Sequence, residues 1–164
     1  TLYAGDRALK KTIDDAMRAA FGEDYEELVF APAADQRVQL RLRWRALRNA
    51  QTAADLSDGT LRFLLLLAIL LQPAARPMIA IDEPETGLHP RMLPVIAELA
   101  VEASRRTAVV LVTHSPELLA AFGTTKPAVT VAACVEGETR LSTIEADEFT
   151  PSRRGRGRSA RQPW

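Results

Sequence analysis

The sequence is poor in several features that define whole classes of protein. It has a single cysteine, Cys134, which excludes an internal disulfide and a cysteine-built zinc site and fits the reducing cytoplasm. Its longest apolar run, FLLLLAILL, is far shorter than the about 20 residues that a membrane-spanning helix needs. No signal peptide is visible at its start. We therefore expect a cytoplasmic protein without a membrane partner.

An excess of charge of either sign is also lacking. Basic and acidic residues number 21 each, so the formal net charge is zero and gives no general attraction to nucleic acid or membranes. The distribution is uneven, because the end PSRRGRGRSARQPW has five arginines and no acid, leaving 16 basic and 21 acidic residues in 1–150. This composition predicts a basic, disordered tail over residues 146–164.

The 164 residues, 47% of them hydrophobic, suffice for one domain with a core. The chain begins with Thr1 rather than Met, and we expect it to be part of a longer protein.

Residues 1–50 predict a helix followed by two strands. In residues 6–20, apolar side chains recur at helical spacing with charges on the opposite face. YEELVFAP favours a strand ending at Pro32. RVQLRLRW, residues 37–44, alternates apolar and polar side chains, which is typical of a half-buried strand with a basic outer face. We interpret that face as a solvated edge, with a nucleic-acid-binding stripe as the less favoured alternative.

Residues 51–145 predict a parallel α/β unit. LSDGT precedes LRFLLLLAILLQP, which favours a helix buried on most sides, and RPMIAID and TAVVLVTHS are typical of buried parallel strands. Between these strands, residues 90–106 predict a helix with Pro94 in its first turn. Such a strand–helix–strand unit implies a right-handed crossover. PELLAAFG then predicts a short helix that stops at Gly123, and AVTVAACV and ETRLSTI predict a terminal hairpin.

Acidic and polar residues follow both predicted parallel strands. Asp82 and Glu83 end the first strand, and residues 113–115, which include His114, end the second. Open α/β sheets bind ligands at this carboxyl edge. One carboxylate could hold Mg²⁺, its neighbour could polarise a water, and a histidine could contact a γ-phosphate, which together suit phosphoryl transfer. The simpler alternative is that Asp82 caps the turn and Glu83 is solvated.

The stretch LSDGT lies at the start of a predicted long helix, where the helix N-terminus carries partial positive charge. Backbone N–H groups and the helix dipole favour an anion near Ser57 and Gly59, and a glycine lets the backbone approach a phosphate closely. The alternative is an ordinary helix cap made by Ser57, Asp58 or Thr60.

Three stretches together resemble a known family. LSDGT, MIAIDEPETGLHP and VLVTHSPELL resemble the signature motif, the Walker B motif with its D-loop, and the switch histidine of ABC-type ATPases. The sequences DEPETGLHP and LSDGTLRFL are similar to those of the RecF/SMC/OLD-like AAA branch. The resemblance spans about residues 50–122. The resemblance implies the α/β C-terminal lobe of a P-loop NTPase of ABC type, with parallel strands, flanking helices and a terminal hairpin.

The resemblance also implies roles for single residues and the cofactors ATP and Mg²⁺. Asp82 would contact Mg²⁺, Glu83 would activate the attacking water, and His114 would engage the γ-phosphate. The signature residues would contact a nucleotide held by another subunit of a homodimer, and the D-loop residues would lie at the dimer interface. The former are Leu56, Ser57, Asp58, Gly59 and Thr60; the latter are Gly87, Leu88 and His89.

One expected motif is missing from the sequence. No Gly-x-x-x-x-Gly-Lys-Ser/Thr loop occurs, so the phosphate-cradling Walker A loop is expected in an upstream N-terminal lobe. The resemblance implies ATP hydrolysis by a dimerising ATPase that serves DNA repair or defence, with DNA or a nuclease as a further partner. The alternatives are a non-catalytic remnant or interaction module, a transporter ATP-binding subunit, which the signature and D-loop argue against, and a serine hydrolase, which lacks the Gly-x-Ser-x-Gly elbow.

Overall fold

The computed structural model describes residues 2–32, 37–73, 76–125 and 127–144. The chain divides into two compact units, Thr1–Phe122 and Gly123–Trp164. The predicted disordered tail, residues 146–164, lies outside the described residues. Among the helices described, none is both long and apolar enough to cross a membrane.

The first unit opens with two helices, α1 (Leu2–Gly5) and α2 (Arg7–Phe21). Helix α2 starts where Asp6 Oδ1 accepts hydrogen bonds from the N–H groups of Ala8 and Leu9, at 2.9 and 3.1 Å. The helix predicted over residues 6–20 is therefore confirmed. Its predicted apolar face turns inward, with Ala16, Met17 and Ala20 buried.

An antiparallel sheet follows, with strand order β1-β2-β3. After a 3-10 turn, η1 (Gly22–Asp24), its strands are β1 (Tyr25–Pro32), β2 (Val38–Trp44) and β3 (Gln51–Thr52). The arginines of β2 have local partners: Arg41 donates to Gln39 Oε1, and Arg43 lies 3.3 Å from a Glu27 carboxylate oxygen. These pairings agree with a solvated face, but the prediction of an edge is wrong, because β2 pairs with β1 on one side and with β3 on the other.

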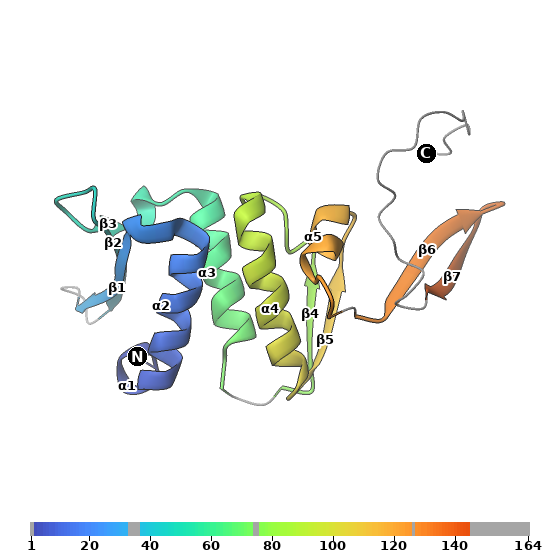
Figure 1. The fold of residues 1–164 in the computed structure, drawn as a ribbon, viewed down its shortest axis with the longest axis horizontal. Coiled ribbons are helices and arrows are strands. Elements are labelled where there is room, and N and C mark those ends of the chain that lie inside the picture. Colours follow the sequence, from blue (N-terminus) through green and yellow to red (C-terminus); the bar gives the residue numbers. More distant parts are fainter. Residues whose placement is uncertain (1, 33–36, 74–75, 126, 145–164) are drawn as a thin grey trace. The chain divides into compact units, whose positions relative to one another are not determined.

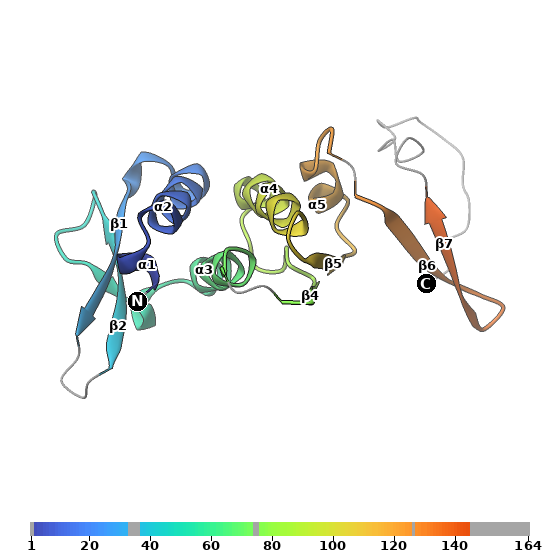
Figure 2. The same cartoon turned by 90° about the horizontal axis from the view of Figure 1, so that it is seen from below.

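Three helices share the core of the first unit. Helix α3 (Asp58–Leu70) follows the short turn η2 (Ala53–Asp55), and α4 (Leu93–Ser104) follows η3 (Pro90–Met92). Helices α2, α3 and α4 lie side by side (Figures 1 and 2). Each fully buried side chain contributes roughly 1.5–3 kcal/mol through burial. The largest fully buried side chains include Met17, Leu42, Phe63, Leu67, Leu70 and Ile96. Helix α3 is less enclosed than predicted, since Leu65 is 58% exposed.

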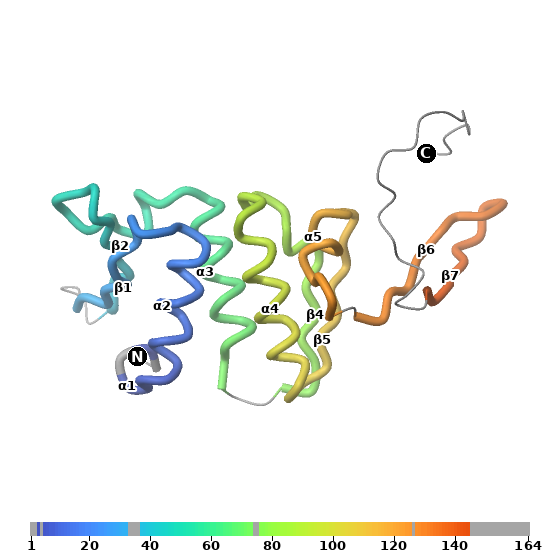
Figure 3. Tube along the Cα trace, viewed as in Figure 1, coloured from blue at the N-terminus to red at the C-terminus, as the bar shows by residue number. Residues whose placement is uncertain are grey.

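Two parallel strands, β4 (Met78–Asp82) and β5 (Ala108–Val112), are joined through α4, as predicted. Figure 3 follows this path and continues into α5 (Pro116–Ala121). The prediction that both strands are buried on both faces is wrong. Met78, Val110 and Val112 are 57%, 45% and 52% exposed, because only the face that carries Ile79 packs on the core and no other described element of the first unit covers the opposite face.

The second unit contains the predicted hairpin. Strands β6 (Val129–Val135) and β7 (Glu138–Ile144) pair antiparallel. The connecting residues Glu136 and Gly137 both have positive φ, 54° and 84°, as a two-residue turn that matches the strand twist requires.

A charged network ties α1 and α2 to the sheet. Asp14 is 8% exposed, and its Oδ1 accepts hydrogen bonds from the hydroxyls of Tyr3 (2.7 Å) and Tyr25 (2.6 Å), while Oδ2 accepts one from Lys10 Nζ (2.7 Å). Burial raises the pKa of the Asp14 carboxyl, but the hydrogen bonds from Lys10, Tyr25 and Tyr3 outweigh it and leave the pKa lowered. The carboxylate therefore stabilises the fold above about pH 4, and this contribution is lost as pH falls through the lowered pKa.

We predict that Asp14→Asn lowers the free energy of unfolding by about 2 kcal/mol at pH 7, since hydrogen bonds to a charged acceptor are lost. The deficit relative to wild type should be smaller at pH 2 than at pH 7, because the wild-type carboxylate loses its charge as the pH falls through its lowered pKa. Urea denaturation of the full-length protein at both pH values measures it. Asp15→Asn, in an exposed ion pair with Lys11, is the control and should change stability by less than about 1 kcal/mol. An equal deficit at both pH values would contradict the charge argument.

Candidate functional site

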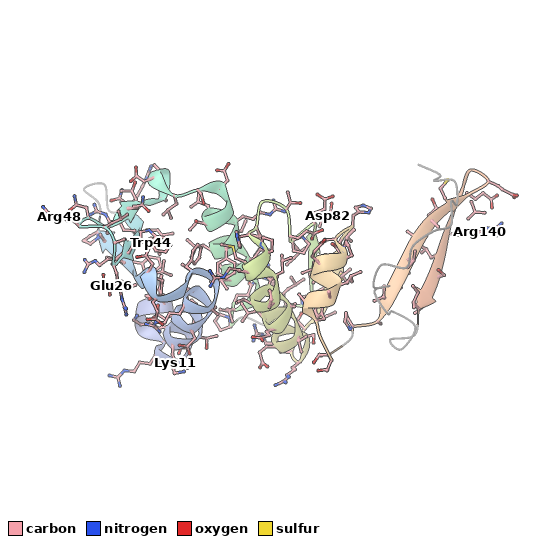
Figure 4. The ribbon with its side chains drawn as sticks, turned by 45° about the horizontal axis from the view of Figure 1, so that its top comes forward. Lys11, Glu26, Trp44, Arg48, Asp82 and Arg140 are labelled. Carbon is pink, nitrogen blue, oxygen red and sulfur yellow. The ribbon has the colours of Figure 1, made fainter. Side chains whose placement is uncertain are left out.

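The carboxyl ends of β4 and β5 meet at one edge, as the sequence predicted. Asp82 pairs with Val112 in the parallel register, and the Glu83 N–H continues the ladder by donating to the Val112 carbonyl at 2.8 Å. Figure 4 labels Asp82 at the end of β4. Asp82 and Glu83 thus leave the sheet beside residues 113–115, and the side chains of both acids and of His114 are exposed.

Glu83 occupies a strained backbone conformation. Its φ is +44°, in the left-handed region that non-glycine residues rarely adopt, at a cost of about 1–3 kcal/mol. Three contacts besides the Val112 bond hold it. Its carbonyl accepts from Arg62 Nη2 (2.7 Å) and from the Thr86 N–H (3.1 Å), and its Oε2 accepts from Thr86 Oγ1 (3.0 Å). Thr86, rather than Asp82, closes this turn, so the simpler alternative of an Asp82 cap is wrong.

A hydrogen bond between side chains joins the two strand ends. Thr113 Oγ1 donates to Glu85 Oε1 at 2.5 Å and accepts from the Ser115 N–H at 2.9 Å. Ser115 then caps α5 by accepting from the Leu118 N–H at 3.1 Å. The turn after β4 and the turn after β5 are thereby linked through Glu85.

The start of α3 is fixed by two successive caps. Asp55 Oδ2 accepts from the N–H and hydroxyl of Thr52, which lowers the pKa of the Asp55 carboxyl. Ser57 is the N-cap of α3: its Oγ accepts from the Thr60 N–H at 3.2 Å and lies 2.8 Å from the Thr60 hydroxyl. The helix-cap interpretation is therefore correct for Ser57, and the exposed Ser57 side chain stays at the helix end where backbone N–H groups favour an anion.

The same helix end packs closely on the turn after β4. A Cβ atom at Gly59 would lie 2.5 Å from the carbonyl oxygen of Gly87, nearer than non-bonded atoms allow. Gly87 itself has φ +75°. Position 59 therefore requires glycine for the close packing of α3 on the turn after β4 within the same chain.

The remaining predicted site residues lie in different surroundings. Leu56 is 8% exposed in the core and Thr60 is 7% exposed, whereas Asp58 is exposed. Leu88 packs against the core, and His89 is exposed, with its Nδ1 accepting from the Arg91 N–H at 3.2 Å. A nucleotide contact by Leu56 or Thr60 and an interface role for the Gly87–His89 stretch stay predictions.

The sequence reasoning assigned no role to Arg62, Glu85 or Thr86. Arg62 could have been recognised from the sequence, because it is the one charged residue in the apolar stretch LRFLLLLAILL. The sequence offers no such signal for Glu85 and Thr86, since their partners come from the turn itself and from a strand end far along the chain.

The donors at this edge suit magnesium rather than a metal held by protein alone. Among the described residues, no three His, Cys, Asp or Glu side chains gather closely enough to hold a metal ion. Mg²⁺ is commonly bound by one or two carboxylates, with waters and substrate phosphates completing its shell. The exposed Asp82 carboxylate fits that requirement.

A protein-family model described as "AAA domain, putative AbiEii toxin, Type IV TA system" matches residues 6–120, which is most of the chain. The chain belongs to this AAA domain family. The match covers α2, the antiparallel sheet, α3, the β4–α4–β5 unit and α5. No curated protein matches its sequence.

Solved structures share the fold of this AAA domain at low identity. One, from work on ATP-driven dimerization and DNA-stimulated activation of SMC ATPases, has a TM-score of 0.63 at 12% identity, over 85% of each chain. The Pyrococcus furiosus Smc head bound to the C-terminal domain of ScpA has a TM-score of 0.64 at 13% identity, over 86% of this chain and 35% of its own. The SMC head from Thermotoga maritima has a TM-score of 0.54 at 17% identity, over 88% and 50%.

The resemblance to ABC-type ATPases of the RecF/SMC kind is thereby confirmed, as is the α/β fold class with parallel strands and flanking helices. The AAA domain spans most of the first of these relatives and half or less of the other two.

We predict that Gly59→Ala lowers the free energy of unfolding by about 1–3 kcal/mol, because the new methyl group forces α3 away from the Gly87 carbonyl. Gly5→Ala is the matched control: no atom lies within 4 Å of its Cβ position, so stability should stay within about 1 kcal/mol of wild type. Urea denaturation of the full-length protein compares the two. Equal stability of both variants would contradict the close packing.

Proposed function

We propose that this AAA domain binds and hydrolyses ATP as the C-terminal part of a dimerising ATPase. The observation that carries the proposal is the shared edge at which Asp82, the strained Glu83 and the turn at 113–115 meet. Membership of the AAA family and the SMC-like fold support nucleotide binding. A cytoplasmic location belongs to the same proposal.

Glu83 acts as the general base on the attacking water. Thr86 Oγ1 holds one carboxylate oxygen, Oε2, and among the described residues the other oxygen, Oε1, has no hydrogen-bond partner. Oε1 is therefore free to accept the proton of a water aligned with the γ-phosphate. The fixed turn aims the carboxylate before substrate arrives, which reduces the entropy cost of alignment.

Asp82 and His114 act on the substrate's phosphates. Asp82 would hold Mg²⁺, and the bound ion would supply charge neutralisation at the substrate's phosphates. His114, exposed after β5 and without a hydrogen-bond partner among the described residues, donates to a γ-phosphate oxygen.

The end of α3 serves a nucleotide bound by a second copy of the protein. Ser57 is exposed at the N-terminus of α3, where the helix dipole and backbone N–H groups favour a phosphate. The Gly87–His89 stretch, which packs on Gly59, lies at the same dimer interface. The Walker A loop comes from the upstream lobe of each copy.

We place the protein in defence or DNA repair, acting with DNA or a partner nuclease. The family is described as a putative toxin of a Type IV TA system, which supports a role in defence. The solved structure from work on DNA-stimulated activation of SMC ATPases supports DNA as a partner. The second candidate is a non-catalytic interaction module, and the observation that favours it is the missing phosphate loop in these 164 residues.

We predict that Glu83→Gln in the full-length protein lowers kcat for ATP at least about 100-fold, since a general base contributes 10²–10⁴-fold. ATP binding should persist and the ATP-bound dimer should live longer. Steady-state hydrolysis and size-exclusion chromatography with ATP measure both. Glu98→Gln, on the exposed side of α4, is the control and should retain wild-type turnover. Normal turnover in Glu83→Gln would show that Glu83 is not the general base.

We predict that the 164-residue chain alone has negligible affinity for ATP, because it lacks the Walker A lysine and backbone cradle. Calorimetry of this chain beside the full-length protein tests it. Micromolar binding by the chain alone would show a phosphate site within it. A full-length protein that neither binds nor hydrolyses ATP would instead favour the interaction module.

A further inference from the structure

Arg62 makes an unusual contact for an arginine in an apolar helix. Its Nη2 donates to the Glu83 carbonyl at 2.7 Å, while its Nε is buried and has no partner among the described residues. An unsatisfied buried donor costs about 1–3 kcal/mol. For stability alone, an apolar side chain here would avoid that cost, so the contact with Glu83 suggests a role other than stability.

Among the described residues, that contact is the one hydrogen bond between α3 and Glu83. The other hydrogen bonds to Glu83 come from Val112 on β5 and from Thr86 in the same turn. A residue at φ +44° keeps its conformation only while its surroundings fix it. Loss of the Arg62 bond would therefore leave the Glu83 carbonyl tied only to the Thr86 N–H.

Helix α3 rests on the turn after β4 at two points. Gly59 lies against the Gly87 carbonyl, and Arg62, nearly one helical turn further on, holds the Glu83 carbonyl. A helix moves as a rigid rod, and a hydrogen bond of 2.7 Å is lost when its atoms separate by about 1 Å. A displacement of α3 that separates these two atoms by that amount would therefore release the Glu83 carbonyl.

We propose that Arg62 is a positioning residue that couples the signature end of α3 to the alignment of Glu83. This inference rests on the proposed function, in which that end of α3 contacts the nucleotide of a second copy. When Ser57 engages that nucleotide, α3 is held in place and Arg62 fixes the Glu83 turn. Hydrolysis in one site then depends on contact with the other copy.

The test uses the full-length protein with Arg62→Met, which keeps the apolar stem and removes every donor. We expect kcat to fall about tenfold or more, with KM for ATP and ATP-dependent dimerisation within about twofold of wild type, since one aligning hydrogen bond is lost. Arg62→Lys, which keeps a charged donor nitrogen, should recover at least about a third of wild-type kcat. Arg105→Met is the control, because Arg105 is a mostly exposed arginine paired with Glu102 and should leave kcat unchanged.

A double-variant cycle separates positioning from a structural role. If Arg62 acts through Glu83, adding Arg62→Met to Glu83→Gln should lower kcat by no more than about twofold further. Melting temperatures of each variant identify loss of fold. Should Arg62→Met unfold, Arg62→Leu, which also removes every donor, takes its place in both backgrounds.

The outcomes distinguish the two proposals. An active wild type with a folded Arg62→Met at wild-type kcat would overturn the role of Arg62 alone, as would a further tenfold loss in the Glu83→Gln background. A wild type that hydrolyses no ATP would overturn the proposed function and the coupling together.

Discussion

The parallel pairing of β4 with β5 is the constraint on which the rest of the site depends. The register that sets Asp82 beside Val112 brings two stretches far apart in sequence to one edge, and the ladder continues through the Glu83 N–H. Helix α4 is the crossover that makes the strands parallel, and its buried face anchors them to the core. Without this pairing, the acids and the 113–115 turn would have no fixed relation.

On that base the structure builds a strained turn and holds it from several sides. Glu83 sits at φ +44°, fixed by β5, by Thr86 and by Arg62 of α3, while Glu85 reaches across to Thr113. Strain of this kind persists only where the surroundings over-determine the backbone, and it clusters at functional sites. The close contact of Gly59 with Gly87 adds α3 to the same assembly. The turn after β4, the start of α3 and the end of β5 are therefore held together by direct contacts.

Much of the fold could be predicted from the sequence because its patterns are local. The helical spacing in 6–20, the alternation in 37–44 and the Glu136–Gly137 turn each specify their own element, and each is present. The prediction of buried parallel strands was wrong for Met78, Val110 and Val112. An apolar strand is consistent with burial on both faces, but whether a second layer covers it depends on other elements, which the strand's own residues do not encode.

The sequence by itself determined the motifs, the order of elements and the edge at which Asp82 and Glu83 emerge, because residue type and period decide these within a few residues. Only the tertiary structure decided that Glu83 adopts a left-handed backbone, that Arg62 holds its carbonyl, and that Thr113 bonds Glu85 rather than the flanking acids. These contacts join residues 21 and 28 positions apart. Their formation depends on how α3, β4 and β5 pack together, and no local pattern records that packing.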